Sequence, residues 1–556
     1  MSDKKKRRSS AGGLVLAGLL GLLIQGGCGK SGGPGGTGGA SGSATCDGPI
    51  VADPLGITFK PPGRTFADSQ TVELASATGS EIRFTTDGTL PTVASPRYAG
   101  PLALTASTRL RAIAIAANGT TSREPAAATY LRVAADAQAF SSNLQIFVIH
   151  TFDRGALAQD GTEFVPANLL AFAAPGADSK LLGPAALDVR MGIHVRGETS
   201  RGFAKKQYAI ELRAPGSDDD RDQALAGLPC QSDWVVGDAI QFDRALIRNA
   251  LAYQLSNVIG RYAPRTRFVE AFLVTDGGDV KAAHFLGLFT VIEKIKRDVQ
   301  RVNVTKLSAA DVGDPARTGG YILRIDKGGS DFAAAGSQFQ FVYPSSEEMM
   351  DPLRAPQFEY ISGFVTDFGL AVSSPNFMHP SKGTPYTDYI DVDSFIDHNI
   401  INALTKNVDA LRISAYFHKE RGGRLAAGPV WDFDRSLGTT LDGRATKPGE
   451  WRDARSDGTD YFNEGFWHEL FRDPAFRARY KARFLSLLRN ELAPDRLAAM
   501  VDALAATVGP AAASRNFARW PELPPAGGDW TSELTILKDF LRQRAAFIEK
   551  DLNANF

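Results

Sequence analysis

Cysteine and histidine are scarce in this 556-residue chain, which contains three of the first and seven of the second. Three cysteines cannot form a four-cysteine zinc site, and the histidines lack the His-x-x-x-His spacing of helical metal sites. No Gly-x-Ser-x-Gly sequence joins a predicted strand to a helix, which argues against a serine hydrolase. The 62 basic residues balance the 62 acidic ones, so charge gives no indication of a nucleic-acid partner.

Long hydrophobic runs are also missing, apart from one short stretch near the amino terminus. There "KKKRR" precedes the apolar stretch Leu14–Ile24, and Cys28 follows after two glycines. The stretch is too short for a membrane-spanning helix, so residues 1–28 are predicted to be an export signal with Cys28 as the lipid-modified residue. Gln25 stands where such signals usually have an apolar residue, which leaves ordinary cleavage nearby as an alternative. We therefore expect an exported protein of the cell envelope, held at a membrane by a lipid anchor.

Residues 29–52 are rich in Gly and Ser, and they are predicted to form a flexible linker. The other two cysteines, Cys46 and Cys230, could form a disulfide in an oxidising compartment. They lie far apart in the sequence, however, and Cys46 borders the glycine-rich stretch. We therefore expect two unrelated thiols rather than a disulfide.

Residues 53–132 show the alternating pattern of short β-strands, with Gly, Asp and Asn between them. Four stretches carry this pattern: "QTVELAS", "SEIRFTTDG", "TRLRAIAIAANG" and "AATYLRV". They predict a small β-sandwich. The sequence "TTDGTLPT" and the strands after it resemble the chitobiase/β-hexosaminidase C-terminal domain, an accessory module of many secreted proteins. The resemblance implies little about function, and Asp87 within it is interpreted as a turn residue.

From residue 138 to residue 556 the pattern becomes a mixture of strands and helices. Strands are predicted at "LQIFVIHTF", "LDVRMGIHVRG", "KKQYAIELRA", "FVEAFLVTDG", "HFLGLFTVIEKI" and "GGYILRIDKG". Helices are predicted at 243–259, at 392–406 and over most of the chain beyond Asp460, where the last one begins with the capping sequence "TSEL". Strands thus come before helices, which predicts an α+β fold with two lobes.

Acidic residues lie at both ends of a predicted hairpin in this region. Asn407 and Asp409 precede the strand "LRISAYFHKE", and Asp432 and Asp434 follow the returning strand "LAAGPV". Asn and Asp also start turns, so turn formation alone is the simpler interpretation. A kinase active centre needs the same order, however: a catalytic Asp, a hairpin, and then an Asp that holds magnesium. The hairpin would bring these acids to one edge.

Several ordered motifs resemble the spore coat protein H-type (CotH) family of atypical kinases, over roughly residues 140–550. They are "HVRGETSRGFAKKQYAIELR", "LIRNALAYQLSNVIGRYAPRTRFVEAFL", "GLFTVIEKIKRD", "GGYILRID", "KNVDALRISAYFHK" and "GPVWDFDRSLG". This family transfers phosphate from ATP to Ser or Thr of proteins through a kinase-like fold. The resemblance therefore implies a two-lobed kinase-like domain that uses ATP with Mg²⁺ or Mn²⁺ and acts on a protein substrate.

The resemblance also assigns roles to the acidic residues of the hairpin. Asp409 matches the family's catalytic Asp, which would accept the proton of the substrate hydroxyl. Asp432 matches the metal-binding Asp. Asn407 and Asp434 lie close enough in the sequence to complete the metal's ligands, since Mg²⁺ prefers oxygen.

Basic residues are expected to neutralise the ATP phosphates. Lys205 and Lys206 open a predicted strand, on which only one of two neighbours can face the cleft, and we favour Lys206. Glu293 would orient that lysine, as a glutamate does in ordinary kinases. Arg196 and Arg248 are further phosphate-binding candidates, because a guanidinium group matches phosphate geometry.

Two other functions stay open. An exported protein meets little ATP, so the kinase-like body could be a catalytically silent surface scaffold. The combined presence of Asp409, Asp432, a lysine and Glu293 argues against that. Paired carboxylates could instead cleave glycosides, as the chitobiase-type module suggests, but the "DFD" hairpin with a nearby Lys and Glu does not favour this. The sequence departs from ordinary kinases in having "RGETSRGF" in place of Gly-x-Gly-x-x-Gly.

Overall fold

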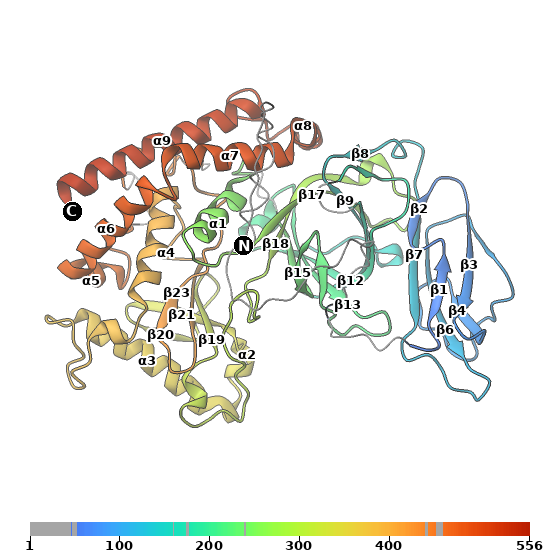
Figure 1. Cartoon of the computed structure of the whole chain (residues 1–556), viewed down its shortest axis with the longest axis horizontal. Helices are drawn as coiled ribbons and strands as arrows, with labels where there is room; N and C mark the ends of the chain where they lie inside the picture. The colour runs from blue at the N-terminus through green and yellow to red at the C-terminus, as the bar shows by residue number, and fades with distance from the viewer. Residues whose placement is uncertain are drawn as a thin grey trace, which may run out of the picture. The chain divides into compact units, whose positions relative to one another are not determined.

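The computed structural model describes Cys46 and residues 53–159, 161–173, 177–237, 241–439, 443–451 and 460–556. The predicted export signal with Cys28, and most of the predicted linker, lie outside these residues. The described chain is α+β, with most strands early and most helices late, as predicted (Figure 1). No single described helix is long and apolar enough to cross a membrane, although the bent pair Pro494–Val508 and Pro510–Arg519 meets the criteria by length and composition.

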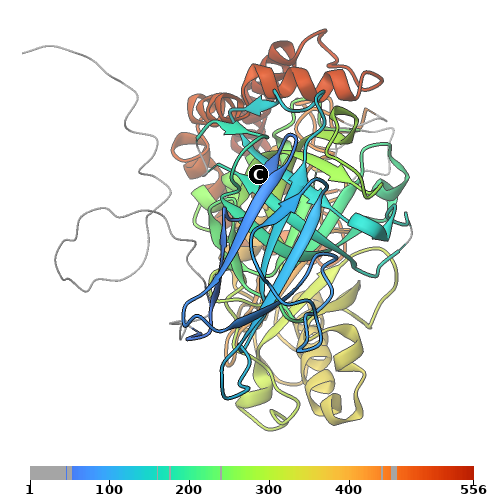
Figure 2. The same cartoon turned by 90° about the vertical axis from the view of Figure 1, so that its right-hand side faces the viewer.

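A β-sandwich forms the first part, as predicted, and it faces the viewer in Figure 2 (blue). One sheet has the order β1 (Ile57–Lys60), β3 (Gln70–Ser76), β5 (Leu102–Leu104), and the other has the order β2 (Arg64–Phe66), β7 (Ala126–Arg132), β6 (Thr108–Ile115), β4 (Glu81–Thr85). Apolar side chains such as Val72, Leu110 and Tyr130 form its core. Asp87 is a turn residue, as predicted, because its Oδ1 accepts from the backbone N–H of Thr89 at 2.9 Å.

Seven strands close into a barrel in the next part of the chain. Their order is β10 (Val165–Phe172), β12 (Leu187–Arg196), β13 (Gln207–Arg213), β16 (Asp233–Gly237), β18 (Phe285–Glu293), β17 (Thr266–Val274), β9 (Gln145–His150). Neighbouring strands are antiparallel except β17 and β9, whose parallel pairing closes the barrel. Buried side chains such as Phe147, Ile193 and Val291 belong to one hydrophobic cluster drawn from these strands. The sequence predicted five of these strands and missed β10 and β16.

Two short ladders accompany the barrel: β8 (Ser141–Ser142) with β11 (Ser179–Lys180), and β14 (Gln223–Leu225) with β15 (Leu228–Gln231). A five-stranded sheet follows, with the order β20 (Phe332–Ala334), β21 (Ser337–Tyr343), β19 (Tyr321–Ile325), β22 (Ala415–Lys419), β23 (Leu425–Ala427). Only β19 and the hairpin β22–β23 in this sheet were predicted. The hairpin is therefore one edge of a larger sheet, which fixes its position.

Nine helices occur among the described residues. They are α1 (Arg248–Val258), α2 (Ser346–Met349), α3 (Ala355–Ser373), α4 (Val392–Thr405), α5 (Trp467–Arg472), α6 (Pro474–Arg489), α7 (Pro494–Val508), α8 (Pro510–Arg519) and α9 (Trp530–Asn555). Short 3₁₀ turns occupy 152–154, 199–202, 282–284, 316–318, 352–354 and 386–388. Helices α7 and α9 pack side by side (Figure 1). The helix α3 was not predicted.

The capping residues at the starts of three helices can be compared with the helix starts predicted from the sequence. The side chain of Asp391 caps α4 by accepting from Ser394 N–H at 3.4 Å. Helix α9 is capped by Asp529, which accepts from Ser532 N–H at 2.7 Å, so the cap comes before the predicted "TSEL". Helix α1 begins at Arg248 rather than at Asp243, because the Asp243 carboxylate accepts backbone N–H groups in the turn ahead of the helix.

Cys46 and Cys230 form a disulfide, so the expectation of two unrelated thiols is wrong. Their Cα atoms are 5.7 Å apart although 184 positions separate them in the sequence. Cys230 lies on β15, and the fold brings this ladder to the beginning of the described chain. Distance along the chain was therefore a poor guide to pairing here.

Polar contacts join the sandwich to the barrel. Arg132 on β7 pairs with Asp279 at 2.8 Å, and the Thr65 hydroxyl donates to the Leu181 carbonyl at 2.5 Å. The Asp188 carboxyl accepts from Thr129 N–H at 2.6 Å. Burial raises the pKa of Asp188 to about 7, and the hydrogen bonds from Thr129 oppose this rise only in part.

This junction predicts a pH-dependent stability. An Asp with a folded-state pKa near 7 binds a proton in the native state at pH values where the unfolded chain, with a pKa of about 3.9, has lost it. The native state is therefore expected to lose stability as pH rises from about 4 to about 7. Thermal unfolding of the wild type and of Asp188→Asn across this range checks the prediction. The variant should show a smaller decline in Tm, by a few degrees, and parallel curves would contradict it.

Candidate active site

The two arms of the hairpin bring three acids together, and we call Asp409, Asp432 and Asp434 the acid cluster. Asn407 joins the arms because its amide contacts both. Its Nδ2 donates to the Asp432 carbonyl at 3.2 Å, and its Oδ1 accepts from Asp409 N–H at 3.2 Å. The Tyr461 hydroxyl donates to the Asn407 carbonyl at 2.9 Å and holds this residue from the other side. The structure thus places the three acids near one another, so that their charges interact.

Helix α1 supports the second arm. The Tyr253 hydroxyl accepts from Asp432 N–H at 3.3 Å, and the Asn249 side chain accepts from Phe433 N–H at 2.7 Å. Phe433 is fully buried and meets Tyr253 edge to face at 6.2 Å. Asp432 adopts the left-handed φ of 66°, which is uncommon for a residue with a side chain and is often found at functional sites. The helix thus fixes a backbone conformation that would otherwise be unfavourable.

Two members of the acid cluster share a hydrogen bond between their side chains, namely Asp432 and Asp434. Two carboxylates can share such a bond only if one of them carries a proton. Burial and the nearby charge of Asp409 raise the pKa of Asp432, and Arg196 opposes this rise. Burial, together with the charges of Asp432 and Asp409, raises the pKa of Asp434 well above its usual range.

Asp409 is buried and faces two arginines. Arg435 donates to its two carboxylate oxygens at 3.3 and 3.1 Å, and Arg412 lies 3.8 Å away. The Ser414 hydroxyl donates to Asp432 at 3.4 Å. Neither Arg435 nor Ser414 was predicted from the sequence as a site residue. Arg435 follows the "DFD" motif directly, and that position was the available signal.

Arg196 is the predicted phosphate-binding residue that the structure brings to the acid cluster. It ends β12, lies over the Trp431 ring at 5.7 Å, and donates to the Gln207 side chain at 3.2 Å. Its charge lowers the pKa of the neighbouring Asp432 carboxyl. A cation next to these acids suits an anionic ligand.

The two predicted lysines point to different surroundings. Lys205 is buried: its ammonium donates to the Leu288 carbonyl, donates to Asn516 Oδ1 at 2.8 Å, and lies 4.4 Å from the Phe289 ring centre. Lys206 is half-buried and donates to the Arg201 carbonyl at 2.6 Å. Lys206 therefore contacts the loop that replaces the glycine-rich loop, whereas Lys205 connects β18 to α8.

Glu293 pairs with Arg265 and not with a lysine. Arg265 donates to its carboxylate through Nε at 2.9 Å and Nη2 at 2.6 Å, and through its backbone N–H. The Tyr262 hydroxyl donates to it at 3.2 Å, and Arg301 lies 3.8 Å away. The predicted Lys–Glu ion pair is thus replaced by an Arg–Glu pair at the end of β18, and the carboxylate is fully buried.

Arg248 is also fully buried, and its contacts are internal. Its Nη1 donates to Asp243 at 2.8 Å, its Nε donates to the Leu437 carbonyl at 3.3 Å, and Glu533 lies 4.0 Å away. The Asp243 charge also contributes to the raised pKa of Asp434. The structure therefore places Arg248 in the layer behind the acid cluster.

The acid cluster is not a closed metal cage. Among the described residues, no group of three or more His, Cys, Asp or Glu side chains is arranged to hold a metal ion. Mg²⁺, however, commonly takes only one or two carboxylates and completes its shell with waters and substrate phosphates. Asp432 and Asp434, whose carboxyls lie within hydrogen-bonding reach of each other, match that smaller donor set. The amide of Asn407, the third predicted ligand, bonds to the hairpin arms.

Residues on α1 that hold the acid cluster were not singled out from the sequence. Asn249 and Tyr253 are four positions apart, so one face of the helix presents both to the second arm. They occur within the stretch "LIRNALAYQLSNVI", which was predicted to be a helix, was part of a CotH-like motif and supplied only Arg248 as a candidate site residue. The helical spacing of two polar groups was the signal that could have identified them.

A helix, a hairpin and an acid on each arm, in a mixed sheet-and-helix domain, define a kinase-like α+β protein. The model of the family described as CotH kinase protein matches residues 193–548, and the chain belongs to that family. The model of the chitobiase/β-hexosaminidase C-terminal domain matches residues 61–125. Both resemblances seen in the sequence, and their order along the chain, are confirmed.

A solved structure matches part of the chain at low identity. It is described as the Shewanella oneidensis MR-1 toxin–antitoxin system HipA, HipB and its operator DNA complex, and it has 13% identity and a TM-score of 0.26. The match covers 63% of this chain and 66% of that chain, just under two thirds. A TM-score of this size carries no argument about fold or function. No curated protein matches the chain.

Proposed function

We propose that the chain is an exported, lipid-anchored CotH-type kinase that transfers the γ-phosphate of ATP to Ser or Thr of surface or secreted proteins. The observation that carries the proposal is the convergence of Asp409 and Asp432 across one hairpin, with Asn407 joining the arms. Asp409 would accept the proton of the attacking hydroxyl, as the order of acids in a kinase requires. Arg435 and Arg412 hold its carboxylate in place.

A divalent cation, Mg²⁺ or Mn²⁺, would be held by Asp432 and Asp434. Bound there, the cation would neutralise charge on the transferred phosphate. The carboxyls support this role because they lie close enough to share a proton, which a divalent cation could replace. Arg196 is next to this pair and would contact the phosphates, and Lys206 would do so from the loop after β12.

The location and the partners rest on the amino-terminal sequence. The basic residues, the apolar stretch and Cys28 support export and lipid attachment at the cell envelope. An anchored kinase would act on proteins at the same surface, and the balanced charge supports a protein rather than a nucleic acid as partner.

A silent scaffold is the second candidate, and one observation favours it. The groups that an ordinary kinase uses to hold ATP are bound to other partners, because Glu293 pairs with Arg265 and Lys205 contacts Leu288 and Asn516. A glycosidase is not supported. Its two carboxyl groups need a separation of about 5–10 Å, whereas the Asp432 and Asp434 carboxyls lie within hydrogen-bonding reach of each other.

Phosphate transfer by the full-length chain, purified in detergent, tests the proposal. The assay supplies labelled ATP with Mg²⁺ or Mn²⁺ and casein as a generic acceptor, beside the same reaction with EDTA. Incorporation that depends on the metal is the expected result. If the assay shows no incorporation and no metal-dependent ATP binding, the kinase proposal is rejected and the scaffold is favoured.

A further inference from the structure

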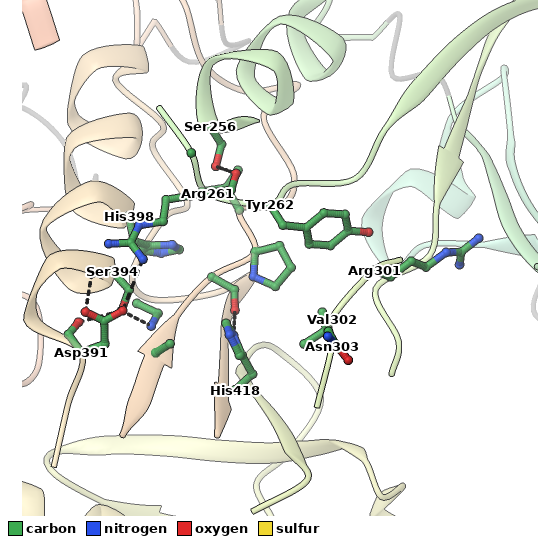
Figure 3. A pocket seen from close by; sticks show the side chains of 16 residues that line it. Ser256, Arg261, Tyr262, Arg301, Val302, Asn303, Asp391, Ser394, His398 and His418 are labelled. Atoms are coloured by element: carbon green, nitrogen blue, oxygen red, sulfur yellow. Dashed lines mark hydrogen bonds and ion pairs between the residues drawn. The ribbon is translucent and has the colours of Figure 1, made fainter. Parts of the chain in front are cut away.

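A cavity of about 290 Å³ lies beside the hairpin β22–β23 (Figure 3). Its walls are the segment after α1, the first half of α4, residues 301–303 and the hairpin itself. No residue of the acid cluster lines it. The cavity adjoins a second hollow, with which it shares Asp391, His418 and Ala426. It is therefore a separate space that phosphate transfer at the acid cluster does not use.

His398 lines this cavity from α4 with an unsatisfied imidazole. Its exposed fraction is 4%, and neither ring nitrogen has a hydrogen-bond partner within the described part of the chain. Stacking on Trp467, with ring centres 6.4 Å apart and planes at 11°, fixes its orientation. Buried polar groups almost always have partners, so these two nitrogens indicate a missing ligand or bound water.

Both histidines of the cavity are neutral near pH 7. Burial lowers the pKa of His398 to about 4, so one ring nitrogen donates and the other accepts. Burial also lowers the pKa of His418. The Nδ1 of His418 bonds to the Gly428 carbonyl at 3.2 Å, which requires a proton on Nδ1 and leaves Nε2 as an acceptor. The two imidazoles thus offer one donor and two acceptors.

The charged side chains near these histidines neutralise one another. Arg261 donates to Asp397 at 2.8 Å and to Asp391 at 3.3 Å. Arg301 donates to the carbonyls of Asp233 and Lys294, and Figure 3 shows its guanidinium directed away from the two histidines. Asp391 would repel an anionic ligand in this cavity, and Arg261 would repel a cationic one. An apolar molecule would leave His398 without partners, so a neutral polar ligand fits best.

We propose that this cavity binds a small neutral polyol, a monosaccharide or cyclitol, through His398 and His418. Hydroxyl groups both donate and accept, which matches the mixed roles of the two imidazoles. The volume equals roughly ten waters at about 30 Å³ each, which suits a single ring of about twelve non-hydrogen atoms. Tyr262, Val302 and Val430 line the same space and offer apolar surface to the carbon–hydrogen face of the ring.

Histidine-detected NMR on the full-length chain tests this site. D-Glucose and myo-inositol are titrated separately into protein with ¹⁵N-labelled histidine. The His398 and His418 imidazole signals should shift and saturate with a Kd of about 1 mM for at least one polyol. His468, which is exposed on α5, should not shift. Because the assay measures binding alone, its outcome does not depend on whether the chain is a kinase.

Two variants and one control make the test decisive. His398→Phe keeps a ring against Trp467 but removes both nitrogens, and it should weaken binding at least about tenfold. Ala426→Leu narrows the cavity and retains both imidazoles, so it should weaken binding even if the first variant folds poorly. His468→Phe should bind as the wild type does. No saturable shift with either polyol, or unchanged affinity in both cavity variants, would overturn the proposal and leave a water-filled space.

Discussion

Replacing Asp409 or Asp432 by asparagine is expected to abolish phosphate transfer. Loss of the base at Asp409 should lower kcat by about 10²–10⁴-fold, the usual contribution of general-base catalysis. Loss of the Asp432 carboxylate should remove metal-dependent ATP binding as well, since one of two cation ligands is gone. Initial rates with labelled ATP and casein, together with ATP titrations with and without Mg²⁺, measure both effects.

The Asp432→Asn variant should fold at least as well as the wild type. Its neutral side chain removes one of the two nearby aspartate charges that, together with burial, raise the pKa of Asp434. Lost activity with retained thermal stability would therefore mark a chemical role. Asp502→Asn is the matched control, because this acid on α7 is exposed and pairs only at the surface with Lys538. Activity within twofold of wild type in both Asp409→Asn and Asp432→Asn would contradict the catalytic and metal-binding roles proposed for these two residues.

Glu293→Gln is expected to lower the free energy of unfolding by about 3 kcal/mol, because it leaves Arg301 buried without its carboxylate partner. The change also removes the two charge-assisted hydrogen bonds from the Arg265 guanidinium. Urea unfolding followed by tryptophan fluorescence measures this loss. Asp539→Asn, which breaks an exposed ion pair with Arg542, should change the value by no more than about 0.5 kcal/mol.

The same variant separates two roles for Glu293. A glutamate that orients an ATP-binding lysine would, when neutralised, weaken ATP binding while stability stayed close to wild type. If Glu293 instead holds Arg265 and Arg301, the variant should lose stability while its ATP binding stays close to wild type. An unchanged urea midpoint with weaker ATP binding would therefore restore the kinase-like role and reject the structural one.

Local patterns allowed much of the fold to be predicted. Alternation of apolar and polar residues identified the sandwich strands and five barrel strands, because each such strand shows one face to a core. The pairing of β17 with β9 was not predictable, since the two strands are parallel and lie far apart in the chain. Strand patterns state which face is buried and leave the partner open.

For the candidate site as well, the sequence predicted which residues lie near one another on the hairpin, but it did not predict the partners of the more distant charged residues. The hairpin placed Asp409 and Asp432 at one edge, because turn and strand lengths fix where two arms meet. The partners of Glu293 and Lys205 could not be predicted, since a charged side chain binds whichever group the fold brings near. The partner of Glu293 is Arg265, which directly precedes β17, and a partner of Lys205 is Asn516 on α8. The disulfide between Cys46 and Cys230 was also missed, because only the fold brings these two distant residues together.

That disulfide also determines how mechanical tension enters the molecule. A pull on the chain ahead of Cys46 passes through the sulfur–sulfur bond to Cys230 on β15, and so reaches the barrel along covalent bonds. The sandwich lies in the loop between the two cysteines and carries none of this load. With the bond reduced, the same pull would travel through β1–β7 and be resisted by their hydrogen bonds. Tension applied ahead of Cys46 therefore bypasses the sandwich as long as the disulfide is intact.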